Sequence, residues 1–110
     1  MGFINSIIEQ GLVDQDYVDK HTYGYPELKA RAAEFPAEYV EKITGVKAAD
    51  IRKFAKEFAT AQPSVIRLGV ALERIAGGGQ ALRAVCSLPA LGGSWPHVGG
   101  GLLQMPLWDF

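Results

Sequence analysis

The stretch Pro63-Ser-Val-Ile-Arg-Leu-Gly-Val-Ala-Leu-Glu-Arg-Ile-Ala-Gly-Gly-Gly79 decides the fold of this chain. Val65, Ile66 and Leu68 form a short apolar run, rich in β-branched residues, directly after a proline. This run predicts a strand that is buried on both faces. Three glycines then lead into an apolar helical pattern over residues 80–91. A strand, a glycine turn and a helix in this order are typical of an α/β protein.

Length and composition limit the class of protein. The chain has 110 residues, enough for one domain with a modest core, and 48% hydrophobic residues exclude a disordered chain. A net charge of −1 gives no general attraction to nucleic acid or anionic lipid, so neither is expected as a partner. Cys86 is the single cysteine, which excludes an internal disulfide and a multi-thiolate metal site. In the helical pattern over residues 80–91, Cys86 lies beside Leu82 and Val85, so we predict that it is a small residue of the core.

Residues 1–61 predict five helices ahead of the strand. Apolar residues recur at helical spacing, and the ends are marked by residues with known positional preferences. Gly11 is expected to end the first helix, and Asp14 to cap the second. Pro26 suits the first turn of a third helix, and Gly45 the end of a fourth. The fifth helix must stop near residue 61 because Pro63 follows.

The last part of the chain, residues 92–110, is rich in glycine and tryptophan and carries only one formal charge, Asp109. It shows neither strand alternation nor a helical stripe, so we expect a loop pressed against other backbone. Its apolar side chains need a cover, and they are Leu102, Leu103, Met105, Leu107 and Trp108. One strand cannot satisfy its own backbone groups. We therefore expect either a segment of a larger α/β protein or, for the isolated piece, a homo-oligomer.

The familiar catalytic patterns are absent from the sequence. His21 and His97 form no HxxxH or HExxH spacing, and neither a GxSxG nor a Walker A sequence occurs. Ser94 has no base near it in sequence. We therefore predict no catalytic residue and no metal ligand in this chain.

A helix–turn–helix pattern over residues 44–54 offers an alternative function. A helix would end at Gly45 and the next would begin near residue 48, which allows a DNA-binding or other non-enzymatic helical interaction module. Its exposed cations would be Lys47, Arg52, Lys53 and Lys56. Two helices joined by a glycine turn are also an ordinary packing motif.

The region between the strand and the last helix is the better candidate. The strand ends at Gly69, and Arg74 lies before the glycine turn, where a cation can pair with a phosphate or a polar ring. Free N–H groups at the end of the strand and the start of the helix would favour an anion. The alternative is an ordinary connection whose glycines serve packing only, because Gly69 to Gly77 does not match GxGxxG.

Four segments, in order, resemble the molybdopterin oxidoreductases of the dimethyl sulfoxide reductase family. The family includes formate dehydrogenases, nitrate reductases and thiosulfate or polysulfide reductases. The first is Ile8-Glu-Gln-Gly-Leu-Val-Asp-Gln-Asp-Tyr-Val-Asp-Lys-His-Thr22, and the second Glu41-Lys-Ile-Thr-Gly-Val-Lys-Ala-Ala-Asp-Ile-Arg-Lys-Phe-Ala55. The third is residues 68–93, which resemble the family pattern except at Ala71 and Ile75, and the fourth is Pro96-His-Val-Gly-Gly-Gly101.

The resemblance implies an internal, mostly helical α/β segment of a large catalytic subunit, with about six helices and one strand of the parallel type. It would comprise a helical part (1–61), a strand–loop–helix with a loop facing a cofactor (62–91) and a tail (92–110) that continues into the parent. The cofactor would be bis(molybdopterin guanine dinucleotide) with molybdenum or tungsten, bound through Gly69, Val70 and Arg74.

The resemblance also implies that other parts of the enzyme lie outside these residues. The family's metal ligand and its iron–sulfur cysteines match nothing here, so the segment alone should be inert. Its partners would be the remainder of the catalytic subunit and an electron-transfer subunit. Such enzymes work in the prokaryotic cytoplasm or periplasm, and the sequence does not choose between these compartments.

Overall fold

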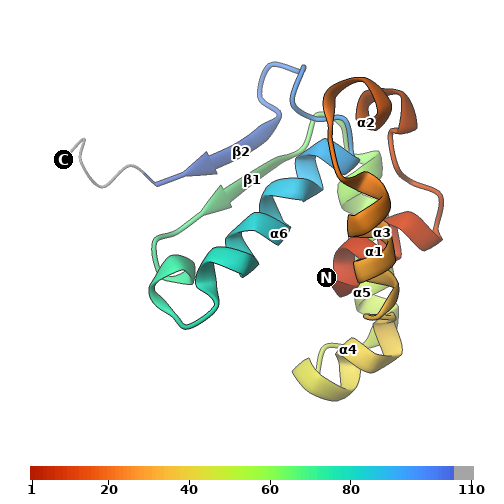
Figure 1. Cartoon of the computed structure of the whole chain (residues 1–110), viewed down its shortest axis with the longest axis vertical. Helices are drawn as coiled ribbons and strands as arrows, with labels where there is room; N and C mark the ends of the chain where they lie inside the picture. The colour runs from red at the N-terminus through yellow and green to blue at the C-terminus, as the bar shows by residue number, and fades with distance from the viewer. Residues whose placement is uncertain (106–110) are drawn as a thin grey trace.

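Figure 1 shows the computed structural model, in which residues 1–105 are described. Helices cluster at one side of the molecule, and two strands with a long helix beside them form the other side. The elements are α1 (Gly2–Glu9), α2 (Gln15–His21), α3 (Tyr25–Ala33), α4 (Ala37–Thr44), α5 (Ala48–Thr60), β1 (Val65–Leu68), the 3₁₀ turn η1 (Leu72–Arg74), α6 (Gly78–Leu91) and β2 (Gly101–Gln104). The expectation of a mostly helical α/β segment with six helices is confirmed.

Short-range signals explain where the helices begin and end. The Asp14 carboxylate accepts a hydrogen bond from the Tyr17 N–H at 2.9 Å and so caps α2. Gly45 takes a left-handed conformation with φ of 75° and ends α4. Helix α5 ends at Thr60, three residues before Pro63, as that proline requires.

One core joins the helical elements and the far end of α6. Its central residues come from α1, α2, α3, α5 and α6, and they are Ile4, Ile7, Val18, Ala32, Ala55 and Leu91. Leu91 also ties the chain through its backbone, because its carbonyl accepts a hydrogen bond from the Asp14 N–H at 2.8 Å. A smaller cluster of Ala37, Ala48 and Ile51 holds α4 against α5. The C-terminal end of α6 is therefore anchored in the helical side.

The sequence did not predict the second strand, β2. β2 lies in the glycine-rich tail and pairs in parallel with β1, with Val65 opposite Gly101 and Leu68 opposite Gln104. Helix α6 runs beside the two strands and connects them (Figure 1). A strand of four residues that begins with glycine has too little alternation to be recognised. Its pairing with a strand far away in sequence, and not its composition, defines it.

Two burial predictions were wrong. β1 is not buried on both faces, since Val65 is 58% exposed and alternate residues along the strand are exposed. Among the described residues only β2 pairs with β1, so much of its surface remains open. Cys86 is also exposed, because the residues that α6 buries lie at its two ends. Periodicity alone identified a helix with an apolar side but not which elements cover it.

The loop part of the tail packs closely against itself, as expected. A Cβ on Gly100 would lie 2.1 Å from the Ser94 carbonyl oxygen. A Cβ on Gly101 would lie 2.7 Å from the Trp95 ring. Leu103 is 57% exposed, so part of the tail's apolar surface does lack a cover. The expectations for Leu107, Trp108 and Asp109 lie outside the described residues.

Candidate functional site

The candidate site lies at the carboxyl edge of the two-stranded sheet. β1 and β2 run in parallel and end side by side, where the Met105 N–H donates to the Leu68 carbonyl at 3.1 Å. Residues 69–71 follow β1 and lead into η1, after which Gly77 opens α6. In open α/β sheets, ligands bind outside the carboxyl ends of the parallel strands. The connection between β1 and α6 therefore occupies the position where a ligand is expected.

The backbone of residues 69–71 carries free hydrogen-bond donors. Within residues 1–105, the N–H groups of Gly69, Val70 and Ala71 donate no hydrogen bond to another protein group. No atom lies within 4 Å of the position that a Cβ on Gly69 would take, so this backbone is open to close approach. Gly69 is exposed and Val70 is half-buried. These N–H groups can donate to an external acceptor without breaking a hydrogen bond of the fold.

The first turn of α6 contributes less than the sequence suggested. The Gly78 N–H donates to the Ile75 carbonyl at 2.9 Å, and the Gln80 N–H donates to the Gly77 carbonyl at 3.0 Å. Local carbonyls thus satisfy part of the donor set that helix N-termini usually offer to anions. Within residues 1–105, the N–H groups of Gly77 and Gly79 also donate no hydrogen bond to another protein group, so free donors lie both in the loop after β1 and at the start of α6.

Arg74 is the last residue of η1 and is exposed. Among the described residues it enters no ion pair, whereas Arg31 and Arg52 do. Its neighbour Glu73 accepts a hydrogen bond from Gln104 Nε2 at 2.7 Å, so a carboxylate also lies at this edge. Sequence reasoning missed the contact between Glu73 and Gln104, because it depends on the unrecognised strand β2. Gly69, Val70 and Arg74 thus lie on one short connection, as their sequence positions require.

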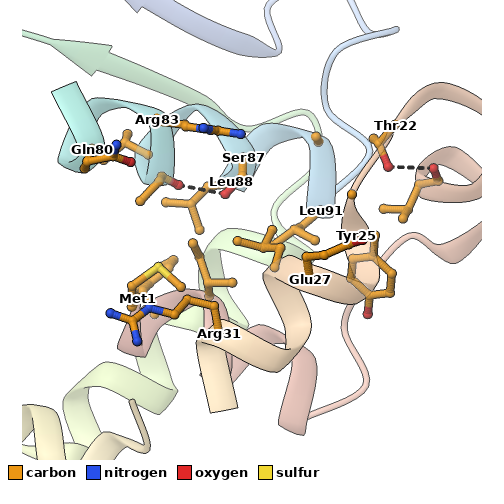
Figure 2. A pocket seen from close by; sticks show the side chains of 18 of the residues that line it. Met1, Thr22, Tyr25, Glu27, Arg31, Gln80, Arg83, Ser87, Leu88 and Leu91 are labelled. Atoms are coloured by element: carbon orange, nitrogen blue, oxygen red, sulfur yellow. Dashed lines mark hydrogen bonds between the residues drawn. The ribbon is translucent and has the colours of Figure 1, made fainter. Parts of the chain in front are cut away.

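A broad groove lies elsewhere, between α6 and the helical side of the molecule (Figure 2). Its volume is about 1140 Å³, and Leu88, Leu91 and Met1 are among the apolar side chains that line it. Arg31 and Arg83 lie at its border in Figure 2. Gly69, Val70 and Arg74 do not line this groove. The groove and the strand-end loop are therefore separate features.

Other chemical candidates have structural explanations. Ser94 is fully buried, and its hydroxyl bonds to Gln62 Oε1 and Ser64 Oγ, both at 2.9 Å. These bonds tie the start of β1 to the turn after α6, and no base is involved. Within residues 1–105, no group of three or more His, Cys, Asp or Glu residues is placed to hold a metal ion.

The helix–turn–helix alternative finds no support. Arg52 pairs with Glu38 across the α4–α5 turn, and Lys53 lies 3.9 Å from the Glu57 carboxylate. The cations on this face are therefore partly neutralised by their own neighbours. No helix in the described part of the chain is both long and apolar enough to cross a membrane.

Comparisons with known proteins agree on one family. The chain is 39% identical over 106 residues to acetylene hydratase of Syntrophotalea acetylenica, covering 96% of the chain and 14% of that protein. It is 35% identical over 95 residues to formate dehydrogenase H of Escherichia coli, covering 84% of the chain and 13% of that protein. It is 31% identical over 114 aligned positions to dimethyl sulfoxide reductase DmsA of Haemophilus influenzae, covering 86% and 14%.

The fold comparison gives the same result. The structure of acetylene hydratase from Pelobacter acetylenicus matches with a TM-score of 0.83 and 40% identity, over 91% of this chain and 14% of that chain. No family model matches the chain. The chain therefore spans about one seventh of the length of these relatives.

These matches first define a class: the chain is homologous to one segment of large oxidoreductase-type enzymes. More specifically, it belongs to the dimethyl sulfoxide reductase family of molybdopterin enzymes, as its four sequence segments predicted. The matched relatives are named for a hydration, a dehydrogenation and a reduction. Membership in the family therefore does not by itself fix the reaction.

Proposed function

We propose that this segment helps to bind the bis(molybdopterin guanine dinucleotide) cofactor of molybdenum or tungsten in a larger oxidoreductase. The contacts would come from the backbone N–H groups of Gly69, Val70 and Ala71 and from the guanidinium of Arg74. The observation that carries the proposal is the set of free donors at the carboxyl edge of a parallel sheet. Membership in a family of molybdopterin enzymes supports a molybdopterin cofactor as the ligand.

The chemistry of the donor set fits this cofactor. A pterin dinucleotide presents diphosphate oxygens and ring carbonyl and nitrogen acceptors, all of which need N–H donors. The loop offers backbone N–H groups, and Arg74 adds a cation whose hydrogen bonds to phosphate are charge-assisted. Because Gly69 has no side chain, a ligand can approach its backbone closely.

The role of these residues is to hold and orient the cofactor. When bound, the metal and its pterins supply the electron-transfer chemistry of the enzyme. Glu73 lies beside Arg74, and its bond to Gln104 directs the carboxylate toward β2. This arrangement lessens the repulsion that an approaching phosphate would otherwise meet. Within this proposal the described residues 1–105 contribute binding and orientation, and none of them is assigned the role of an acid, a base or a metal ligand.

The rest of the proposed enzyme lies outside these residues. We expect the remaining catalytic subunit to provide the metal ligand and the other half of the cofactor site. An iron–sulfur cluster and an electron-transfer subunit would complete the path for electrons. The proposed division into residues 1–61, 62–91 and 92–110 assigns the cofactor loop to the middle part.

Substitution of Arg74 tests the proposal. Arg74→Ala in the full-length protein should lower both the molybdenum or tungsten content and the pterin content per polypeptide, because a charge-assisted contact is lost. Arg74→Lys should retain an intermediate content, since a lysine keeps the charge but not the planar fork. Arg83→Ala is the matched control, because Arg83 is an exposed arginine at the groove instead of the loop. Unchanged metal and pterin contents in Arg74→Ala would overturn the assignment.

A further inference from the structure

The turn η1 lies unusually close to the first turn of α6. A Cβ on Gly78 would lie 2.1 Å from the Leu72 carbonyl oxygen and 3.0 Å from Glu73 Cα. Both neighbouring atoms belong to the backbone, so neither can be relieved by rotating a side chain. Gly78 is also buried. Only a residue without a side chain permits η1 to sit at this distance from α6.

The adjacent glycine does not have this constraint. No atom lies within 4 Å of the position that a Cβ on Gly79 would take, and Gly79 is exposed. Neither Gly78 nor Gly79 has a left-handed backbone, in contrast to Gly77 with its φ of 78°. Gly78 and Gly79 are therefore neighbouring positions in the same helical turn that differ mainly in whether a methyl group has room.

A second contact holds η1 from the side of β2. Gln104 Nε2 donates to Glu73 Oε2 at 2.7 Å, across a separation of 31 residues in sequence. Within the turn, the Arg74 N–H donates to the Ala71 carbonyl at 3.1 Å. The loop of residues 69–71 is thus joined to a turn that α6 and β2 hold from two sides. Movement of η1 would move the free N–H groups and the Arg74 side chain together.

We infer that Gly78 is a positioning residue for the strand-end loop. The missing side chain lets η1 pack directly against α6. This contact and the Gln104–Glu73 hydrogen bond together fix the N–H donors of residues 69–71 and the Arg74 side chain in one arrangement. This inference rests on the proposed function in one respect, namely that the positioned donors bind a pterin dinucleotide. The seating of η1 itself is a property of this chain and can be tested separately.

Hydrogen exchange of the full-length protein provides that test. In the protein freed of cofactor, Gly78→Ala should raise the exchange rate of a peptide covering residues 69–77 by about tenfold, because the added methyl group overpacks the contact. Gly79→Ala should leave the exchange rate of this peptide unchanged. The same helix propensity is gained in both variants, so the difference between them isolates the contact with η1. Equal exchange in the two variants would overturn the inference.

Cofactor content separates this inference from the proposed function. Below the melting temperature of each variant, Gly78→Ala should retain less metal and pterin than Gly79→Ala. A glycine with a merely structural role would lower the melting temperature without this selective loss. If Gly78→Ala loosens the loop but both it and Arg74→Ala keep the full cofactor content, the seating of η1 stands and the proposed function fails.

Gln104→Leu serves as a second variant in case Gly78→Ala does not fold. Gln104 is exposed, so this change removes the hydrogen bond to Glu73 without adding a collision. We expect a rise in exchange confined to residues 69–77 and smaller than about tenfold, because one hydrogen bond is lost and no atom is displaced. Unchanged exchange would show that β2 does not hold η1.

Discussion

The helical side of the molecule and its sheet differ in how completely they bury themselves. The helices enclose a core in which Ile4 and Ile7 are at most 1% exposed. A second, smaller buried cluster lies between α4 and α5. In the sheet, Val65 and Leu103 each expose more than half of their surface. The two sides are joined where Leu91, at the end of α6, enters the helical core. With Leu91 in place, the helical side therefore has a closed core, whereas the sheet needs further cover.

This difference places the candidate site in the less complete region. Within residues 1–105, the loop after β1 has free donors on its backbone, and each of the two strands has one unpaired edge. A cofactor and the remainder of a larger protein would satisfy both. The helical side thus gives stable support to a sheet whose described surface is partly uncovered.

The largest expected effect tests the helical core. Ile7→Ala removes a fully buried side chain and should lower the free energy of unfolding of the chain by about 3 kcal/mol. Ile43→Ala removes the same atoms from a residue that is 63% exposed, so the free energy of unfolding should change by less than about 0.5 kcal/mol. Urea denaturation of both variants measures the difference. Similar losses in the two would contradict a self-sufficient helical side.

The next prediction tests the incomplete sheet. The isolated chain should self-associate through its open strand edges and apolar tail, which light scattering over a range of concentrations can detect. Leu103→Lys should weaken this association by about tenfold, because part of a leucine's hydrophobic contribution is replaced by a charge. Val46→Lys, at a similarly exposed position in the α4–α5 turn, should not. A monomeric native chain at every concentration would contradict the comparison.

A smaller effect is expected where the two sides meet. Asp14 caps α2, and its backbone N–H contacts the Leu91 carbonyl. Asp14→Ala should lower the free energy of unfolding by about 1 kcal/mol through loss of the cap. Asp16→Ala removes an exposed carboxylate from the first turn of α2 together with its pair with Lys20, and should cost about 0.5 kcal/mol. Thermal denaturation measures the loss of stability in both variants, and equal losses in the two would show that the cap is unimportant.

The smallest effect lies in the α4–α5 turn. The side-chain hydrogen bond from Arg52 lowers the pKa of Glu38 below its usual value. Because the pKa of Glu38 is lower in the folded state, the interaction stabilises the fold at pH values above the pKa that Glu38 has in the unfolded chain. This stabilisation is lost as the pH falls through the lowered pKa. Arg52→Gln should return the pKa of Glu38 toward its usual value in an NMR titration. Lys53→Gln, which removes the cation near Glu57, should leave the pKa of Glu38 unchanged.

Local chemistry made much of the fold predictable. A cap at Asp14, a left-handed glycine at Gly45 and a proline at position 63 each act within a few residues, so their effects can be read directly from sequence. The candidate loop was equally visible, because Gly69 and Arg74 follow one apolar run. The family resemblance suggested the proposed ligand, which no local pattern among these residues specifies.

Long-range packing explains what could not be predicted. β2 exists because Gly101 and the following residues pair with β1, and four residues carry too weak a pattern to indicate this. The exposure of Cys86 depends on which side of α6 other elements cover. The contact between η1 and Gly78 likewise depends on the path of the loop in space. In each instance the deciding neighbour is set by the tertiary arrangement.

The parallel pairing of β1 and β2 has a consequence for the order of folding. The paired strands are separated by the entire connection that contains η1 and α6, so closing this ladder costs more chain entropy than forming the helices. We therefore expect α1 to α5 to assemble first, while the ribosome is still synthesising the later residues. The strand-end loop would take its final shape only after β2 has emerged. Until that point, a nascent chain would have its helical scaffold but not the final arrangement of the strand-end loop.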